Sequence, residues 1–170
     1  KTITGIVVHQ TACVFGATPA AIKDARGDRQ LAIARRALGV ACHGLAFRDG
    51  FYAIANPVEW YVWQANGLNA TTLGLEIEGF YSGLCDDPAT VPREDLETTW
   101  GGKPQELTEL AVLTAQTCLL RLVELGRAAG CPIEEIYAHR QSSGTRRSDP
   151  GEAIWRRVVL DYAVRVLGLK

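Results

Sequence analysis

Two histidines and one aspartate form the clearest chemical pattern in this sequence. His9 ends an apolar run near the N-terminus, and His139 is followed ten residues later by Asp149. Two imidazoles and one carboxylate are ligands of hydrolytic zinc sites, which keep a fourth position open for water. Because the chain has only three histidines and two of them fall in such positions, a zinc hydrolase is the leading hypothesis.

A carboxylate on a second segment supports this hypothesis. Alone, the pair of His139 and Asp149 is a weak signal, because Asp-Pro-Gly runs also serve turns for purely conformational reasons. In the segment 73–79, alternation places Glu76 and Glu78 on one face of a strand, about 7 Å apart. A hydrolytic zinc site needs such a group to accept a proton from water and return it to the leaving amine. The alternative is that both glutamates face solvent.

Strands and helices alternate along the chain and must position these residues. Five stretches are typical of strands, and the second of them is a hairpin with an Arg-Asp-Gly turn: 3–9, 40–55, 61–64, 73–79 and 133–138. Three stretches are typical of helices: about 29–38, 109–125 and 152–167. Thr108 is the expected N-cap of the second helix and Gly126 its stop. The pattern predicts an α/β fold in which helices flank a central mixed β-sheet.

The segment 82–106 interrupts this pattern. Asp, Pro, Thr and Gly dominate it, and Trp100 lies inside it. Loops of this length are uncommon in small domains and are often functional. We therefore expect one domain over 1–170 with an inserted loop at about 82–106. A surface loop without function is the alternative.

Composition limits the classes of partner and of catalytic chemistry. A net charge of −1 gives no support to nucleic acid or an anionic membrane as the main partner. No apolar stretch approaches the roughly 20 residues of a membrane span. The five cysteines include no Cys-x-x-Cys pair, which argues against a zinc ribbon and leaves disulfides open. The sequence also lacks a Gly-x-Ser-x-Gly nucleophile motif.

Four motifs in a fixed order carry a family resemblance. They are Ile6-Val7-Val8-His9, Cys42-His43 with Arg48-Asp49-Gly50, Asn69 through Leu73-Gly74-Leu75-Glu76-Ile77-Glu78-Gly79, and His139 through Asp149-Pro150-Gly151. Together they resemble the type-2 N-acetylmuramoyl-L-alanine amidases, a superfamily that includes phage lysozyme-type amidases, cytoplasmic recycling amidases and peptidoglycan recognition proteins. The resemblance spans about residues 3–160, with 82–106 as an insertion.

The resemblance implies a zinc hydrolase that cleaves the amide between N-acetylmuramic acid and the L-alanine of the stem peptide. By motif position, His9, His139 and Asp149 would bind one Zn²⁺ ion. Glu76 would be the catalytic acid and base, and Glu78 is the competing assignment by geometry. The implied partners are peptidoglycan or muropeptides.

Three positions depart from the family pattern. Arg147 replaces a lysine that precedes the third ligand by two residues, and it keeps a positive charge for the developing oxyanion. Cys42 stands where some members have a catalytic tyrosine, and Gln64 where a histidine is common. His43 matches a family histidine that does not usually bind metal, so it is either structural or substrate-lining. The candidate substrate contacts are His43, Gln64 and Trp100.

Two other functions remain as alternatives. A non-catalytic peptidoglycan-binding module would have the same fold, but such members typically lose a zinc ligand, and all three are present here. An amidase for a different muropeptide would draw its specificity from 82–106, where Trp100 could stack on a sugar face. We expect action at the cell envelope or on a cell wall to which the protein is delivered; cytoplasmic recycling is the alternative.

Overall fold

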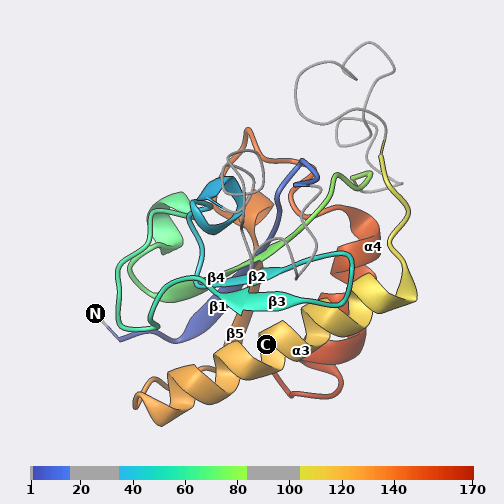
Figure 1. Cartoon of the computed structure of the whole chain (residues 1–170). Helices are drawn as coiled ribbons and strands as arrows, with labels where there is room; N and C mark the ends of the chain where they lie inside the picture. Colours follow the sequence, from blue (N-terminus) through green and yellow to red (C-terminus); the bar gives the residue numbers. More distant parts are fainter. Residues whose placement is uncertain (1, 16–34, 84–103) are drawn as a thin grey trace.

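The fold is built on one mixed β-sheet, shown by a computed structural model that describes residues 2–15, 35–83 and 104–170 (Figure 1). In these residues the sheet has five strands in the order β3-β2-β4-β1-β5. The strands are β1 (Gly5–Gln10), β2 (Gly44–Ala46), β3 (Tyr52–Ile54), β4 (Thr72–Ile77) and β5 (Glu135–Ala138). β1 pairs in parallel with β4 and β5, and β2 pairs in parallel with β4 and antiparallel with β3. The predicted mixed sheet is confirmed.

Helices cover one face of this sheet. α3 (Glu109–Ala128) packs there, beside α4 (Glu152–Ile154) and its continuation η4 (Trp155–Val164), a helix of π type (Figure 1). Alternate strand side chains point to this face and form a core with both helices: Ile6, Val8, Leu73, Leu75, Ile77, Cys118, Leu119, Leu122, Val158 and Val159. The side chains between them on β1 and β4 point to the opposite face. That face carries His9 and Glu76.

The predicted strand at 61–64 is wrong. These residues pair with no strand, and β4, the strand that follows them, is already hydrogen-bonded to β1 on one side and to β2 on the other. The segment instead leads into the short helix η1 (Asn66–Leu68). The strands predicted at 3–9, 73–79 and 133–138 and the 40–55 hairpin are confirmed, with shorter paired regions.

The predicted stop of the long helix at Gly126 is also wrong, since α3 continues to Ala128. Gly126 is needed for close packing, because a Cβ there would lie 2.8 Å from Cγ1 of Ile133. Gly130, with φ of +82°, supplies the left-handed residue after the helix end.

The last predicted helix begins at Glu152 as expected but ends at Val164. Of the helix predicted at about 29–38, residues 35–38 are helical and the earlier ones lie outside the described residues. The inserted loop lies outside them between 84 and 103, together with Trp100. No helix among the described residues combines the length and apolar character that a membrane span requires.

We expect Thr108→Ala to lower the free energy of unfolding by about 1 kcal/mol. The Thr108 side chain accepts a hydrogen bond from the Ala111 N–H at 3.2 Å, which satisfies one donor of the first turn of α3. Urea denaturation followed by circular dichroism measures the change. Thr117→Ala, on the exposed side of the same helix, is the matched control and should change stability by less than about 0.5 kcal/mol. Equal effects of the two substitutions would contradict the cap.

Candidate metal centre

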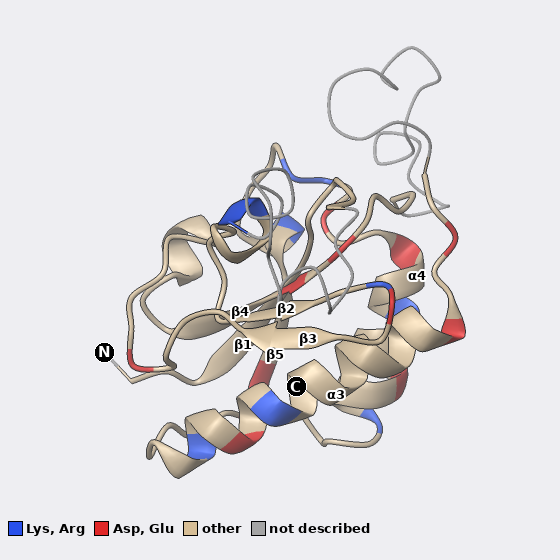
Figure 2. Cartoon of the chain, in the orientation of Figure 1, with Lys and Arg blue, Asp and Glu red and all other residues tan. Residues whose placement is uncertain are grey.

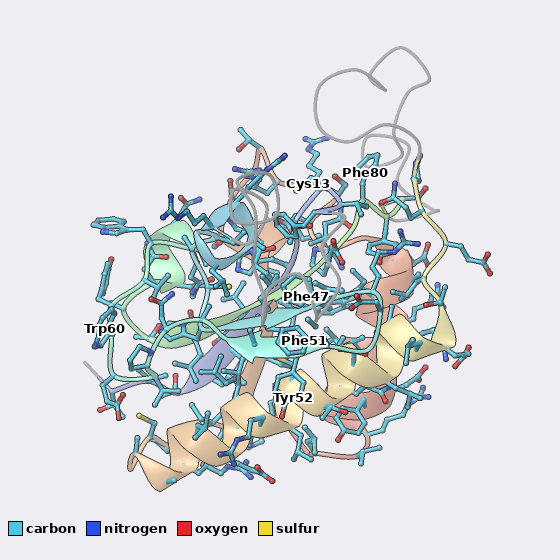
Figure 3. The ribbon with its side chains drawn as sticks, in the orientation of Figure 1. Cys13, Phe47, Phe51, Tyr52, Trp60 and Phe80 are labelled. Carbon is cyan, nitrogen blue, oxygen red and sulfur yellow. The ribbon has the colours of Figure 1, made fainter. Side chains whose placement is uncertain are left out.

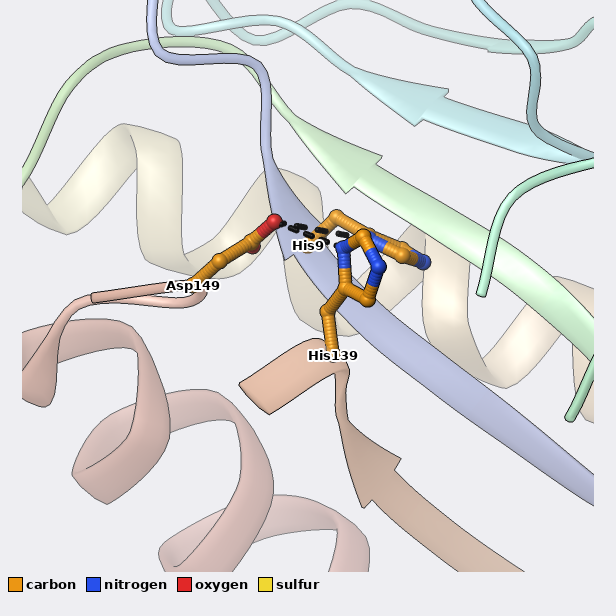
Figure 4. A group of neighbouring side chains, drawn as sticks. All are labelled: His9, His139 and Asp149. Carbon is orange, nitrogen blue, oxygen red and sulfur yellow. Dashed lines mark hydrogen bonds and ion pairs between the residues drawn. The ribbon is translucent and has the colours of Figure 1, made fainter. Parts of the chain in front are cut away.

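His9, His139 and Asp149 come together at one edge of the sheet (Figure 4). His9 lies near the end of β1, and His139 follows the last residue of β5 at the start of η3 (His139–Gln141). The Nδ1 atoms of the two histidines are 3.0 Å apart. Oδ2 of Asp149 lies 2.9 Å from Nδ1 of His139 and 3.7 Å from Nδ1 of His9. All three residues are almost fully buried.

These separations suit a tetrahedral metal ion. Zinc bonds of about 2.0–2.1 Å to nitrogen or oxygen place tetrahedral ligand atoms roughly 3.3 Å apart. The three observed separations of 2.9, 3.0 and 3.7 Å bracket this value. One more position of the tetrahedron remains for water or substrate, which is the arrangement of catalytic rather than structural zinc sites.

A hydrogen-bonded chain sets the tautomer of His9. Nε2 of His9 lies 2.6 Å from Oε1 of Gln64, and Nε2 of Gln64 donates to Oγ1 of Thr72 at 3.0 Å. The Thr72 hydroxyl in turn donates to the Leu68 carbonyl at 2.8 Å. Because the Gln64 amide oxygen can only accept, Nε2 of His9 carries the proton. Nδ1 of His9 therefore keeps its lone pair directed at Asp149 and His139, as a metal ligand must.

The sheet makes room for Gln64 at a glycine. A Cβ at Gly74 would lie 3.0 Å from Cγ of Gln64, so any larger residue on this part of β4 would push the amide away from His9. The main chain of Gln64 is held as well, since its N–H donates to Oδ1 of Asn69 at 2.8 Å. The Gln64 amide is thus positioned by its packing against Gly74 and by the hydrogen bond from its main chain to Asn69.

Gln10 holds the loop that carries Asp149. The Gln10 main-chain N–H donates to Oδ1 of Asp149 at 2.9 Å, which leaves Oδ2 for the histidines. Its buried side chain donates to the carbonyls of Tyr81 and Ser148 and accepts from the N–H groups of Tyr81 and Gly151. One side chain therefore connects the end of β1 to both flanks of the third ligand.

Arg140 fixes the same loop from the other side. Its main-chain N–H donates to the Asp149 carbonyl at 2.9 Å, and its guanidinium donates to the Pro150 carbonyl. The guanidinium also lies over the Trp155 ring, 4.9 Å from the ring centroid, a favourable cation–π arrangement. The main chain at Asp149 and Pro150 is thus held from η3, and the Asp149 carboxylate is held from β1.

The two glutamates of β4 have different surroundings. Both oxygens of the buried Glu78 accept main-chain hydrogen bonds, from Phe15 at 2.7 Å and from Arg48 at 3.0 Å. Glu76 is the parallel-strand neighbour of His9, and its Oε2 is buried without a hydrogen-bond partner. Buried carboxylate oxygens are normally satisfied, so this oxygen differs from those of Glu78 in that no protein group occupies it. The geometry favours Glu76 over Glu78 for proton transfer.

Burial and charge shift the pKa values of the cluster. Burial raises the pKa of Glu76 to about 7, although His9 and Arg146 oppose the shift. Burial alone would raise the pKa of Asp149. Hydrogen bonds with His139 and His9 outweigh burial and lower this pKa to about 2. Burial acts to lower the pKa of His9, yet the charges of Glu76 and Asp149 outweigh it and raise that pKa above 6.5. Asp149 is therefore anionic at neutral pH, and Glu76 can exchange a proton near that pH.

The remaining predicted site residues lie elsewhere or are occupied. His43 accepts a hydrogen bond from the Gly74 N–H at Nδ1, and its Nε2 lies 3.0 Å from the Trp60 carbonyl. Both nitrogens are thus engaged inside the protein, and burial lowers the pKa of His43.

That His43 and Gln64 contact substrate stays a prediction; in this structure the polar atoms of both side chains are hydrogen-bonded to protein groups. His43 braces β4, and Gln64 orients His9. Cys42 is a buried thiol whose pKa is raised by burial and by the charge of Glu76. Arg147 is exposed on the loop 142–148.

Sequence reasoning missed Gln10, Thr72 and Arg140. Each acts through another residue by contacts across the fold. The only local signal is at Gln10, a polar residue directly after the apolar run 3–8 and His9. Its burial in a strand is unusual for a glutamine, and this would have marked it for attention.

Comparison with known proteins identifies one family. A family model described as N-acetylmuramoyl-L-alanine amidase matches residues 1–152. The endolysin N-acetylmuramoyl-L-alanine amidase LysCS from Clostridium intestinale URNW has a similar structure, with a TM-score of 0.58, 17% identity, and coverage of 99% of this chain and 86% of that chain. The Ph2119 endolysin from Thermus scotoductus MAT2119 bacteriophage Ph2119 is also similar, with a TM-score of 0.51 and 18% identity. The match covers 93% of this chain and 83% of that chain. At such identities these structures show the shared fold alone. No curated protein matches the chain.

We expect Gln64→Ala to weaken zinc binding by about tenfold or more, because loss of an outer hydrogen bond to a metal-binding histidine typically has this effect. Competition with a chromophoric chelator measures the affinity. Gln116→Ala is the matched control, since the Gln116 side chain is also hydrogen-bonded, to the Arg157 carbonyl, but on the helix-covered face of the sheet. Parental zinc affinity in a folded Gln64→Ala protein would argue against tautomer control by this amide.

We expect Gln10→Ala to lower the free energy of unfolding by about 3 kcal/mol. The substitution leaves buried N–H and carbonyl groups of Tyr81, Ser148 and Gly151 unpaired, and each such group costs about 1–3 kcal/mol. Urea denaturation of the metal-free protein measures the effect. A loss as small as that of Gln116→Ala would show that water replaces the amide without cost.

Proposed function

The chain belongs to the N-acetylmuramoyl-L-alanine amidase family, and on that premise we propose that it is a zinc-dependent enzyme that cleaves the amide between N-acetylmuramic acid and the L-alanine of the stem peptide. The observation that carries the proposal is the convergence of two histidine nitrogens and one carboxylate oxygen within 4.8 Å. Glu76, with its unpartnered buried oxygen, lies beside them.

The residues present fit a zinc ion. Their donor set is two imidazole nitrogens and a carboxylate oxygen, which is typical of catalytic zinc, and their spacing matches tetrahedral coordination. When bound, zinc supplies a Lewis acid that polarises the scissile carbonyl and makes water more acidic. His9 and His139 would bind it through Nδ1, and Asp149 through Oδ2.

Glu76 would move the proton in this reaction. Its pKa of about 7 allows the carboxylate to accept a proton from the attacking water at neutral pH. The resulting carboxylic acid can then donate that proton to the nitrogen of the departing L-alanine. Because one group does both steps, no covalent intermediate with the protein is required. Glu78 is unsuited to this role, since both of its oxygens hold main-chain N–H groups.

Basic side chains lie near the site on the loop 142–148, where Figure 2 shows a blue segment. Arg146 and Arg147 are both exposed there. By motif position, Arg147 would stabilise the negative charge that develops on the carbonyl oxygen. Arg146 is a second candidate, because its charge lowers the pKa of Glu76 and therefore reaches the site.

The alternative of a non-catalytic peptidoglycan-binding module fits the site less well. A binding module needs neither an anionic third ligand held by Gln10 nor a carboxylate with a free buried oxygen. The substrate places the protein at a cell wall during its action. Recycling of soluble muropeptides would use the same chemistry and is the second candidate.

We expect Asp149→Ala to lose both zinc and turnover, and Glu76→Gln to retain zinc while kcat falls about 100-fold or more. Zinc content is measured by metal analysis, and turnover by mass spectrometry of muropeptides incubated with the zinc-loaded protein. Release of free stem peptide by the parent alone supports the amidase. Intact muropeptides with the zinc-loaded parent would contradict it.

Glu78→Gln is the matched control for the catalytic carboxylate. It should lower stability, because an amide nitrogen cannot accept one of the two main-chain N–H bonds. The folded fraction should keep near-parental kcat. A Glu78→Gln protein that is folded but inactive, beside an active Glu76→Gln protein, would reverse the assignment of the two glutamates.

We expect Arg147→Ala to lower kcat by about 100-fold with little change in zinc affinity, because loss of one group that stabilises an oxyanion typically has an effect of this size. Arg146→Ala is the comparison, measured with the same muropeptide. If Arg146→Ala causes the larger loss, the oxyanion role passes to Arg146.

A further inference from the structure

We propose that Tyr61 and Trp63 form a stacking platform for the glycan strand of peptidoglycan, next to the metal centre. The side chains of Tyr61 and Trp63 are 54% and 77% exposed. Their rings meet edge to face with centroids 5.1 Å apart. We call this pair the aromatic platform. The inference rests on the proposed function, because the occupant is the sugar portion of that substrate.

The platform is ordered although it faces solvent. Val62, between the two rings, is 8% exposed and anchors the segment to the protein. The main chain on either side is also held: the Trp60 carbonyl lies 3.0 Å from Nε2 of His43, and the Gln64 N–H donates to Asn69. Large aromatic side chains on a rigid backbone lose little conformational entropy on binding. Exposed clusters of this kind mark binding surfaces.

The aromatic platform is connected to the metal centre by the main chain. Trp63 is followed directly by Gln64, whose amide oxygen lies 2.6 Å from Nε2 of His9. Two residues later, the Asn66 side chain donates to the Ser142 carbonyl of the loop that leads from His139 to Asp149. The platform segment is therefore continuous with one wall of the metal centre. Figure 3 shows Trp60, at the start of this segment, at the margin of the molecule.

The chemistry of the segment suits an uncharged sugar. Residues 60–72 contain no Asp, Glu, Lys or Arg, although the exposed Glu59 directly precedes them, so the aromatic segment itself carries no charge. Tyr and Trp combine an apolar face with a polar tip, which matches pyranose rings with C–H groups on one face and hydroxyl groups at their edges. The scissile amide joins a sugar to a peptide, so a sugar must lie against a surface that flanks the metal centre. The platform is such a surface among the described residues.

Binding of peptide-free glycan strands tests this inference separately from catalysis. The probe is soluble glycan of alternating N-acetylglucosamine and N-acetylmuramic acid from which stem peptides have been removed, titrated against the zinc-loaded chain by calorimetry. The variants are Tyr61→Ala, Trp63→Ala and the double substitution. Leu113→Ala is the matched control, because Leu113 is a large exposed apolar residue, 57% exposed, on α3.

The parent and Leu113→Ala should bind the glycan with the same affinity, and the double variant should lose at least about tenfold with an unchanged melting temperature. On long glycan strands with stem peptides, kcat/KM of the double variant should fall through a higher KM, whereas Leu113→Ala should keep the parental kcat/KM. Equal glycan binding by the parent and the double variant would overturn the platform.

The two proposals fail in different ways. If the parent cleaves muropeptides but does not bind peptide-free glycan, the platform is wrong and the amidase stands. If the platform-dependent glycan binding is present and no amide is cleaved, the amidase is wrong, and the platform describes a peptidoglycan-binding protein.

Discussion

Parallel pairing of β1 with both β4 and β5 is the constraint on which the site depends. The carboxyl ends of parallel strands meet at one edge of a sheet, and ligand sites form at that edge in α/β folds. His9, Glu76 and His139 lie at or just beyond the ends of these three strands. The same pairing places Ile6, Val8 and the alternate residues of β4 on the opposite face, where they pack under α3 and η4. The register of these strands therefore places the hydrophobic core on one face of the sheet and the metal-centre residues on the other.

Burial of so many polar groups is possible because nearly all of them are hydrogen-bonded. Gln64 and Thr72 satisfy the far side of His9, and Gln10 satisfies the second oxygen of Asp149. An unpaired polar group in this environment costs free energy comparable to a lost hydrogen bond. The unpartnered Oε2 of Glu76 is thus an exception that a functional site can maintain. The supporting residues hold the site in place, and the oxygen that they leave unpaired belongs to the glutamate proposed to transfer the proton.

The two sides of the metal centre offer different surfaces to a substrate. The segment 60–72 is neutral and presents Tyr61 and Trp63 to solvent. The loop 142–148 presents Arg146 and Arg147. A polymer made of uncharged sugars and carboxylate-bearing peptides has matching parts for both. The division of the surface follows from the same two segments that orient His9 and carry Asp149, so binding and catalysis share their supports.

The sequence by itself determined the residue types available to bind a metal, the order of strands and helices along the chain, and the mixed α/β class. The elements follow from local patterns, namely apolar runs, an Asp-Gly turn, and Thr108 before a helix. Strand alternation alone places Glu76 and Glu78 on one face, so the preference for Glu76 over Glu78 came from motif position and not from geometry. Local patterns also misplaced a strand at 61–64 and a helix end at Gly126. Strand pairing in the sheet determined the first outcome, and close packing of Gly126 against Ile133 determined the second.

The tertiary structure determined which nitrogen of His9 faces the metal centre and which glutamate has an unpaired buried oxygen. It also determined which groups Gln64 and His43 contact. Each answer depends on hydrogen bonds between distant segments, such as the pair of His9 and Gln64, separated by 55 residues, and that of Gln10 and Asp149, separated by 139. A hydrogen bond is directional and acts over about 3 Å, so no spacing along the chain can specify it before the strands have been placed side by side.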